Sequence, residues 1–353
     1  MTVLRKASDY KVPTVVILGD FTTPIGDASW RKEERKILDQ DVRDYNLKRI
    51  RAQMEKLVPD SKIVLNSSFY SDFSISFLSE VLPLFNLGHL MSKDFLKCRL
   101  EQDTLTLRDV FYPVLQSYDF YRLVEEHGVG IQLGGQDQWG NITTGIEFIR
   151  KKNTQMRAGG LTIPLLTDSK GLKFGKSGKN TLFLDESLTK PYKVHQYFWN
   201  LSDDKIKELL GFVFSIEIGK SFKDPLEMKE AVIKALFDDV YGLNRYEQVK
   251  EIASLLFSSK LGSLMREQLE KISREIPFVT KKKSETLSSA LVELGLSSSG
   301  SDSKRLVEEE KCIYLFNSQC SKHKERLGAL PSISSYLLFR RGEKEFGLIY
   351  LED

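Results

Sequence analysis

The chain has 353 residues, of which 41% are hydrophobic and 29% are charged, enough apolar content for more than one folded core. Its formal net charge is only +3, so the composition excludes a disordered acidic chain and a polycationic nucleic-acid coat. The three cysteines form no C-x-x-C pair and the four histidines are far apart, which argues against a disulfide framework and a protein-bound metal. No apolar run has the length of a membrane span, so we expect a cytoplasmic protein without a membrane partner, with an organellar location as the alternative.

The N-terminal part of the chain predicts strands that alternate with helices. A helix is expected over residues 1–10, followed by a short apolar strand at 15–18 and a charged helix over about 30–57. Two further buried strands are expected at 129–133 and 161–166, with helices between them. This alternation predicts an α/β domain with a parallel sheet.

After about residue 200 the strand signals stop and the apolar residues take helical spacing. Four helices are expected, over residues 203–214, 226–241, 245–257 and 261–273. We therefore assign residues 1–200 to the α/β domain and residues 201–280 to a helical domain.

The C-terminal tail follows a charged linker at residues 281–283. It predicts, in order, a helix over 284–294, a turn over 295–303, a second helix from Lys304, and a hairpin of strands 336–340 and 346–351. We assign residues 284–353 to a third, small α+β domain.

Two loops follow strands at the edge where open α/β sheets bind ligands. The first, residues 19–27, places Asp27 where it can bind an ammonium group, although this loop taken alone favours a helix-capping role for Asp27. The second, residues 134–141, has paired glycines that let a ligand lie against the backbone. There, Asp137 is suited to ribose hydroxyls and Gln138 to a carbonyl or carboxylate.

A third loop carries Lys173, Lys176 and Ser177 between glycines. Two lysines three residues apart suit a polyphosphate, because their charge can stabilise the charge that develops on a departing pyrophosphate. An ordinary solvated basic loop would look the same. The chain lacks both the Walker G-x-x-x-x-G-K-[ST] motif and G-x-G-x-x-G, so a P-loop NTPase and a Rossmann dehydrogenase are disfavoured.

One otherwise apolar helix carries three polar side chains on one face. Tyr112, Gln116 and Asp119 are spaced i, i+4 and i+7, and their burial without partners would cost a few kcal/mol. They therefore either satisfy one another or line a polar pocket. Thr106 and Asp109 are expected to cap this helix.

These segments together resemble a known family. The strings GDFTTPIGD, YPVLQSYDF, GGQDQWGN and KFGKS follow one another as in the bacterial-type tyrosyl-tRNA synthetases, which are class I aminoacyl-tRNA synthetases. The resemblance runs from about residue 10 to the C-terminus and implies a Rossmann-like catalytic domain, a helical anticodon-binding domain and an S4-like RNA-binding domain. In the last of these the family's V-N-G turn is replaced by residues 315–318.

The resemblance also implies roles for individual residues. Asp119 would accept the hydrogen bond of the substrate phenol, Tyr112, Gln116 and Asp27 would bind the α-amino group, and Gln138 would lie near the reacting carboxylate. Gly135 and Asp137 would hold the adenylate ribose. The pyrophosphate-leaving transition state would be stabilised by the basic side chains Lys173, Lys176, Arg31 and Arg35, with Lys176 also contacting ATP. Arg31 stands where the family has a lysine.

The family's first strand, with G-F-D-P-T, and its H-I-G-H signature have no counterpart in the sequence. We expect that strand to be central in the family's sheet, so that its two neighbours are left with unpaired edges. Gly88-His89-Leu90 lacks a preceding strand, and we interpret it as structural.

The implied function is that of a tyrosine–tRNA ligase, which activates L-tyrosine with Mg²⁺-ATP and transfers it to tRNA(Tyr), and the implied assembly is a homodimer. The alternative is an impaired synthetase fragment or paralogue that acts as an RNA-binding protein. Tryptophanyl-tRNA synthetases are the nearest enzymatic competitor, but Asp119 matches the residue that reads a phenol.

Overall fold

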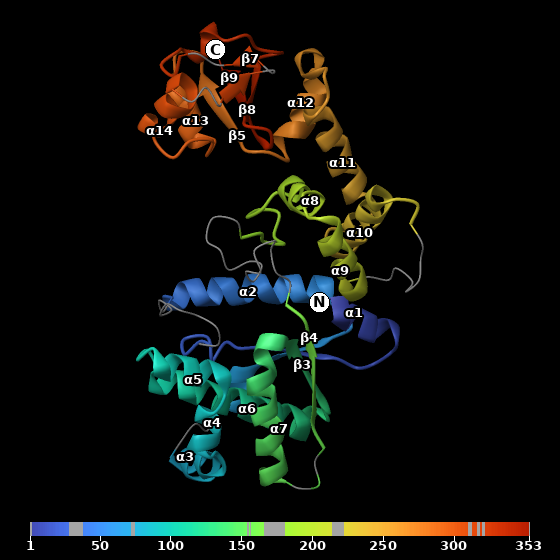
Figure 1. The fold of residues 1–353 in the computed structure, drawn as a ribbon, viewed down its shortest axis with the longest axis vertical. Coiled ribbons are helices and arrows are strands. Elements are labelled where there is room, and N and C mark those ends of the chain that lie inside the picture. Colours follow the sequence, from blue (N-terminus) through green and yellow to red (C-terminus); the bar gives the residue numbers. More distant parts are fainter. Residues whose placement is uncertain are drawn as a thin grey trace. The chain divides into compact units, whose positions relative to one another are not determined.

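The computed structural model comprises two compact units, Met1–Thr181 and Leu182–Asp353, each described here by itself (Figure 1). The residues that the structure describes are 2–27, 38–71, 75–153, 155, 157–165, 181–213, 222–309, 313–315, 318–319 and 322–352. Of the helices in these ranges, none is both long and apolar enough to cross a membrane.

The first unit contains two pairs of parallel strands. β1 (Val15–Leu18) pairs with β2 (Lys62–Leu65), and β3 (Ile131–Gly135) pairs with β4 (Gly159–Ile163). Among the described strands each has that one partner, so β1 and β3 each keep an edge that no described strand covers. This agrees with the unpaired edges expected from the sequence, whereas β2 was not predicted and β4 begins and ends earlier than expected.

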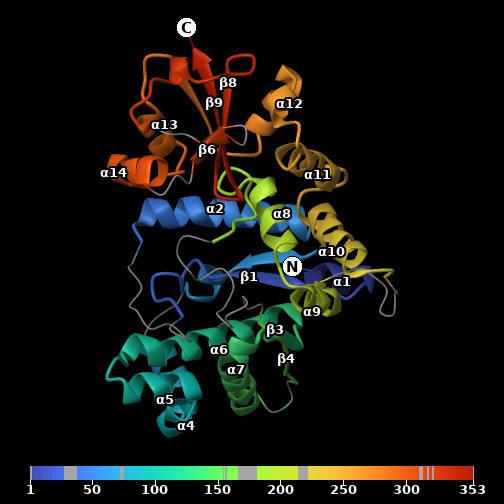
Figure 2. The same cartoon turned by 45° about the horizontal axis from the view of Figure 1, so that its top comes forward.

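Helices pack around these strand pairs, and their apolar faces form a common core (Figure 2). Leu115 and Phe120 of α6 contribute to it, as do Phe148 and Ile149 of α7. The helices of this unit are α1 (Thr2–Asp9), α2 (Gln40–Leu57), α3 (Ile75–Val81), α4 (Leu87–Met91), α5 (Asp94–Glu101), α6 (Leu107–His127) and α7 (Trp139–Lys152). Short 3₁₀ turns connect them at η1 (Asn66–Phe69), η2 (Leu82–Leu84) and η3 (Gln136–Gln138).

Helix α6 has the caps that the sequence predicts. The Thr106 side chain accepts from the backbone N–H of Asp109, and the Asp109 carboxylate accepts from the backbone N–H of Thr106 at 2.9 Å. The helix runs through Pro113 and ends at Gly128, whose φ of +65° is a left-handed conformation that favours glycine. Both ends are therefore fixed locally, which sets the register of the polar face of α6.

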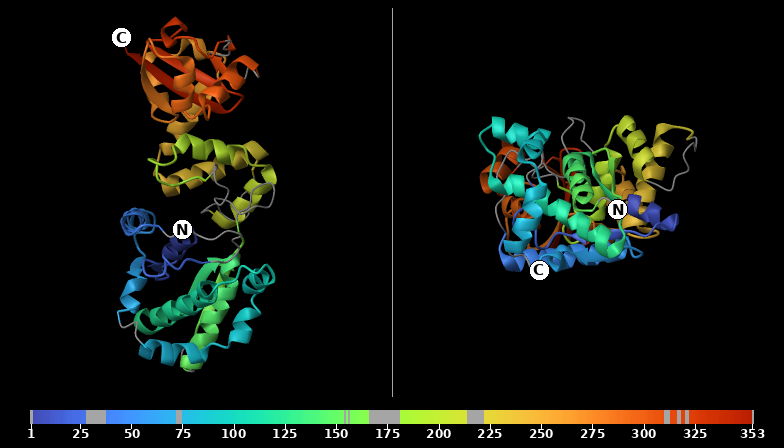
Figure 3. Two further views of the ribbon diagram at one scale, coloured as in Figure 1. Left: turned by 90° about the vertical axis from the view of Figure 1, so that its left-hand side faces the viewer. Right: turned by 90° about the horizontal axis from the view of Figure 1, so that it is seen from below.

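The second unit begins with helices and ends with a sheet (Figure 3). Its five-stranded sheet has the order β5-β9-β8-β6-β7, in which β8 and β9 form the predicted hairpin. Its helices are α8 (Pro191–Trp199), α9 (Asp203–Val213), α10 (Pro225–Val240), α11 (Arg245–Leu256), α12 (Arg266–Ser273), α13 (Leu287–Glu293) and α14 (Gly300–Lys304). Its strands are β5 (Phe278–Lys282), β6 (Ile313–Leu315), β7 (Ser318–Gln319), β8 (Tyr336–Arg341) and β9 (Glu345–Glu352).

Three sequence predictions in this unit were wrong. The expected charged linker at 281–283 overlaps β5, which pairs in parallel with β9. The expected turn over 295–303 contains the start of α14 at Gly300, and the helix expected over 261–273 begins only at Arg266. β5 forms a strand despite its two lysines. Its backbone pairs with β9, and ion pairs with Glu285 and Glu293 neutralise the charge of Lys281.

The helices and the sheet of the second unit share one core. Tyr192 of α8 and Val249 of α11 belong to the same buried cluster as Leu338 and Leu348 of the sheet. Residues 182–200 accordingly belong to this unit, and the division of the chain into three domains stays a prediction.

Candidate active site

A cavity of about 260 Å³ lies where the two strand pairs approach helix α6. Ile17 and Gly19 contribute from β1 and the loop after it, and Gln132 and Gly134 contribute from β3. The polar side chains around it are Thr22, Tyr112, Gln116, Asp119, Gln132 and Gln138. Of the two alternatives that the sequence left open for Tyr112, Gln116 and Asp119, the structure shows the second, since all three line one pocket.

The two loops that follow β1 and β3 meet at this cavity. The Gln138 amide donates to Asp27 Oδ2 at 2.8 Å, a contact between residues 111 positions apart. The Asn141 amide donates both to Gln138 Oε1 at 3.2 Å and to Gln116 Oε1 at 3.1 Å. The structure thus brings three of the predicted amino-acid-binding residues, Asp27, Gln116 and Gln138, into one hydrogen-bonded group, in which Asn141 links Gln116 to Gln138.

Asp119 is the buried carboxylate of the cavity, with 8% of its surface exposed. Its Oδ2 accepts from the side-chain amide of Asn66 at 3.0 Å, and its Oδ1 accepts from the hydroxyl of Tyr70 at 2.8 Å. Asn66 in turn donates to Thr22 Oγ1 at 3.0 Å and accepts from the backbone N–H of Phe21 at 2.9 Å. Asn66 therefore connects the loop after β1 to the carboxylate on α6.

The pKa of Asp119 is raised to about 7, mainly by burial and to a smaller extent by the nearby carboxylate of Asp20, against the lowering effect of the hydrogen bonds from Asn66 and Tyr70. The pKa of the Tyr70 phenol is raised far above its usual range, first by burial and then by Asp119. Tyr70 therefore stays an O–H donor, and Asp119 is an acceptor that ionises near neutral pH.

A second hollow, of about 800 Å³, adjoins the other side of the 136–138 turn. Asp137, Thr162 and Leu165 line it. A Cβ atom on Gly135 would lie 2.6 Å from Asp137 Oδ1 and 2.9 Å from Leu165 Cδ2, so a larger residue would force these two side chains to move. Gly135 and Asp137 are thus neighbours, as the ribose-holding role predicts, although no part of the structure tests that role.

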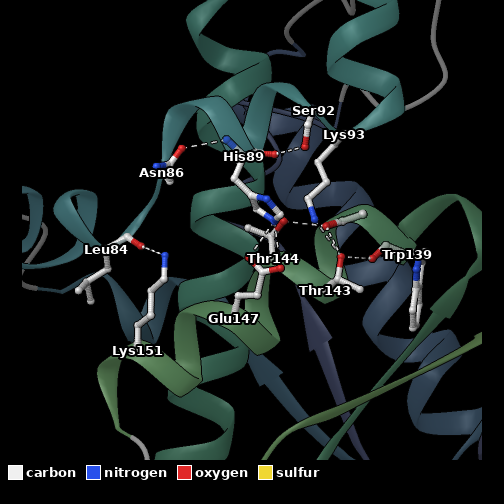
Figure 4. A network of polar contacts seen from close by, with 11 residues as sticks. Leu84, Asn86, His89, Ser92, Lys93, Trp139, Thr143, Thr144, Glu147 and Lys151 are labelled. Atoms are coloured by element: carbon white, nitrogen blue, oxygen red, sulfur yellow. Dashed lines mark hydrogen bonds and ion pairs between the residues drawn. The ribbon is translucent and has the colours of Figure 1, made fainter.

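His89 has a structural role that matches its interpretation from the sequence (Figure 4). Its backbone N–H donates to the Asn86 cap of α4, and its ring Nε2 lies 3.0 Å from Glu147 of α7. Nearby, the Lys93 ammonium donates to Thr143 Oγ1 at 3.3 Å. These contacts join α4 and α5 to α7.

The four basic residues predicted for the pyrophosphate step, Arg31, Arg35, Lys173 and Lys176, lie outside the described residues. Their roles stay predictions. Among the described residues, no group of three or more histidine, cysteine and acidic side chains is placed to hold a metal ion.

Sequence reasoning missed four residues of the site, namely Thr22, Asn66, Tyr70 and Gln132. Asn66 follows β2 at its carboxyl end, so recognition of the apolar run at 62–65 as a strand would have pointed to it. Gln132 is a polar residue in β3, a strand that was expected to be buried but has no buried residue, and among the described residues its Oε1 has no hydrogen-bond partner. The sequence carries no comparable signal for Tyr70.

Comparison with known proteins matches this geometry to one family. The family model of class I tRNA synthetases (W and Y) matches residues 1–254. The tyrosine–tRNA ligase of Mycoplasma mobile is 34% identical over 327 residues, covering 89% of this chain and 79% of that protein. The tyrosine–tRNA ligase of Mycoplasma mycoides subsp. mycoides is 31% identical and covers 99% of this chain and 87% of that protein.

Solved structures of tyrosyl-tRNA synthetases have a fold similar to that of this chain. A C-terminally truncated mitochondrial tyrosyl-tRNA synthetase of Coccidioides posadasii has a TM-score of 0.57 and 25% identity, covering 71% of this chain and 77% of that one. The corresponding Aspergillus nidulans structure, at 23% identity, has a TM-score of 0.59 over 72% of this chain and 80% of that one, and shows the shared fold. The chain therefore belongs to the tyrosyl-tRNA synthetases, within the class I synthetase family for tryptophan and tyrosine.

Proposed function

We propose that this chain is a tyrosine–tRNA ligase that joins L-tyrosine to ATP, releasing pyrophosphate, and then transfers the tyrosyl group to the 3′ end of tRNA(Tyr). The observation that carries the proposal is the cavity with Asp119 buried on α6 and the Asp27–Gln138 pair where the two loops meet. A buried acceptor suits a phenol, and a carboxylate beside an amide suits an amino acid's charged groups. The curated relatives that carry this activity in their names support it.

Within the cavity, Asp119 is assigned to the phenol hydroxyl of the substrate. Asp27, Tyr112 and Gln116 are assigned to the α-ammonium group, to which they offer a carboxylate and two neutral oxygens. Gln138 donates to Asp27 in the unliganded site, and its amide is suited to the carboxylate that reacts with ATP. Covalent catalysis is not required, because holding the carboxylate against the α-phosphate makes the reaction effectively unimolecular.

The remaining residues are assigned to ATP. Gly135 and Asp137 are assigned to the ribose of the adenylate, and this role is supported by the close approach at Gly135. The cationic residues Arg31, Arg35, Lys173 and Lys176 are assigned to the charge that grows on the leaving pyrophosphate. Mg²⁺ is expected to enter with ATP as part of the substrate.

We also propose that the active form is a homodimer. An apolar hollow of about 510 Å³ is lined by Leu82, Phe85, Leu87, Leu107 and Phe111, among others. Leu87 is 62% exposed and Leu107 is 88% exposed, and such apolar patches commonly mark a protein interface. A second copy of the chain is the partner expected here. The assignment to the cytoplasm, with an organelle as the alternative, stays a prediction.

Direct binding of amino acids and tyrosine-dependent exchange of pyrophosphate into ATP test the activity together. Tyrosine should bind and support exchange, whereas tryptophan and phenylalanine should do neither at the same concentration. Preference for tryptophan would contradict the assignment of Asp119. Retention of tRNA binding with no tyrosine binding would favour the RNA-binding alternative.

A further inference from the structure

Tyr70 contacts the phenol-reading carboxylate but is not among the residues that line the cavity. It ends the η1 turn, is 5% exposed, and places its hydroxyl 2.8 Å from Asp119 Oδ1 and 3.0 Å from the carbonyl oxygen of Leu115. None of the roles assigned above includes this residue. Its hydroxyl therefore lies behind the carboxylate relative to the cavity-lining groups.

The ring of Tyr70 is held in one orientation by its neighbours. Phe21 stacks on it with ring centroids 4.2 Å apart and planes 9° apart. Phe77 and Tyr118 contact it from other directions, with centroids 6.1 and 5.5 Å away. Because the backbone of Phe21 is itself bonded to Asn66, the stack and the carboxylate belong to one connected group.

Among the described residues, the hydroxyl of Tyr70 has two acceptors for its one hydrogen, Asp119 Oδ1 and the carbonyl oxygen of Leu115. When Asp119 is ionised, that hydrogen is best placed on Asp119 Oδ1, since a charged acceptor makes the stronger bond. When Asp119 is protonated, the hydrogen can turn to the Leu115 carbonyl, and the Tyr70 oxygen can accept from the carboxylic acid. Tyr70 can therefore hydrogen-bond to Asp119 in both its ionised and its protonated form. Its bond to the ionised form is the one that matters for substrate recognition.

We propose that Tyr70 is a positioning residue for recognition of the tyrosine hydroxyl, which acts by holding Oδ1 of Asp119 while Asn66 holds Oδ2. With one internal donor on each oxygen, the carboxylate is fixed in direction and its remaining lone pairs are available to the cavity. The hydroxyl of Tyr70 also favours the ionised form of Asp119, because it donates to that carboxylate. This inference rests on the proposed function, since it takes Asp119 to be the group that meets the phenol.

The ionisable groups that act on this pair come from the loop after β1 and from α6. Asp20 follows β1 and opposes ionisation of Asp119, while Tyr112 and Tyr118 on α6 act on Tyr70. Asn66 is neutral at every pH. Among these described groups, Tyr70 and Asn66 are the two that stabilise the ionised carboxylate by hydrogen bonding, so removal of the Tyr70 hydroxyl should shift its titration upward.

The test compares Tyr70→Phe with Tyr118→Phe in the full chain. Tyr118 is the matched control, because its ring contacts that of Tyr70 while its hydroxyl accepts from Arg122 at 3.0 Å. The dissociation constants of tyrosine and phenylalanine are measured by equilibrium dialysis from pH 5.5 to 9. The titration of the Asp119 carboxyl is followed in parallel by ¹³C NMR, with Asp119→Asn to assign the signal.

Tyr70→Phe should move the titration midpoint of Asp119 upward by about one pH unit and weaken tyrosine binding at pH 7 about tenfold, as expected for loss of a hydrogen bond to a charged group. Phenylalanine binding and the Tyr118→Phe variant should be unchanged. Unchanged tyrosine binding and an unchanged midpoint in Tyr70→Phe would overturn the inference.

Failure of the proposed function has a different signature. If tyrosine binds wild type and Asp119→Ala equally, Asp119 does not read the phenol, and the role of Tyr70 in recognition falls with it. If only the Tyr70→Phe result is negative, the assignment of Asp119 stands and the positioning role alone is rejected.

Discussion

Replacement of Asp119 by Asn should make the stability of the first unit less dependent on pH. Burial raises the pKa of Asp119 from 3.8 to about 7, so the folded chain holds this proton over a range in which the unfolded chain has lost it. For an acid shifted upward, the free energy of unfolding falls as the pH rises from the unfolded pKa to the folded one. Asparagine cannot ionise, so the free energy of unfolding of the variant lacks this decrease with pH.

The expected size follows from the shift. Three pKa units correspond to about 4 kcal/mol in full, of which about 3 kcal/mol falls between pH 5 and pH 8.5. From pH 5 to pH 8.5, the free energy of unfolding of Asp119→Asn should therefore rise by about 3 kcal/mol relative to that of the wild type. Any constant cost, such as a poorer fit of the new amide to Tyr70 and Asn66, cancels in this comparison.

Urea unfolding at several pH values measures the effect. Trp199→Phe in both proteins removes a tryptophan of the second unit, so that Trp139 at the start of α7 reports on the first unit. Asp103→Asn is the control, because it removes an exposed carboxylate at a position with φ +53°, which asparagine also tolerates. The reasoning would be refuted if the difference in the free energy of unfolding between Asp119→Asn and wild type stayed constant to within about 1 kcal/mol from pH 5 to 8.5.

Three further outcomes are expected. Gly135→Ala should weaken ATP binding and leave tyrosine affinity near the wild-type value, because its Cβ would push Asp137 and Leu165 apart; equal loss of both affinities in isothermal titration would contradict this. Lys176→Ala should slow pyrophosphate exchange at least tenfold with an unchanged Kd for tyrosine, because its charge acts in the transition state; a change in tyrosine affinity alone would remove that role. Leu107→Glu should shift the chain from dimer to monomer in sedimentation velocity, since Leu107 is 88% exposed in the apolar hollow; an unchanged sedimentation coefficient would place the interface elsewhere.

The sequence predicted those parts of the site whose residues are close together in the chain. Tyr112, Gln116 and Asp119 share one helix, so a period of 3.6 residues is enough to place them on one face. Asp27 and Gln138 were assigned by motif, and their contact could not be predicted because it depends on how two separate loops fold back.

The strand β5 and the role of Tyr70 could not be predicted, because each depends on residues distant in the chain. β5 contains a lysine run that looks like a linker, but pairing with β9 and two ion pairs of Lys281 make it a strand. Tyr70 looks like an ordinary core aromatic until α6 brings Asp119 to its hydroxyl, across 49 residues of sequence. In both cases a partner distant in the chain decides the role.

Because β1–β2 and β3–β4 are separate strand pairs, a bound substrate can stabilise the contact between the loops that follow them. In the described structure no strand hydrogen bonds cross from one pair to the other, and at the cavity the link between the loops is the Asp27–Gln138 contact. A bound tyrosine that contacts Asp27 and Gln138 would act as a cross-link between the loops that follow the two strand pairs. Its binding energy would then appear as resistance to local opening, so amides near the cavity should exchange with solvent more slowly as tyrosine is added.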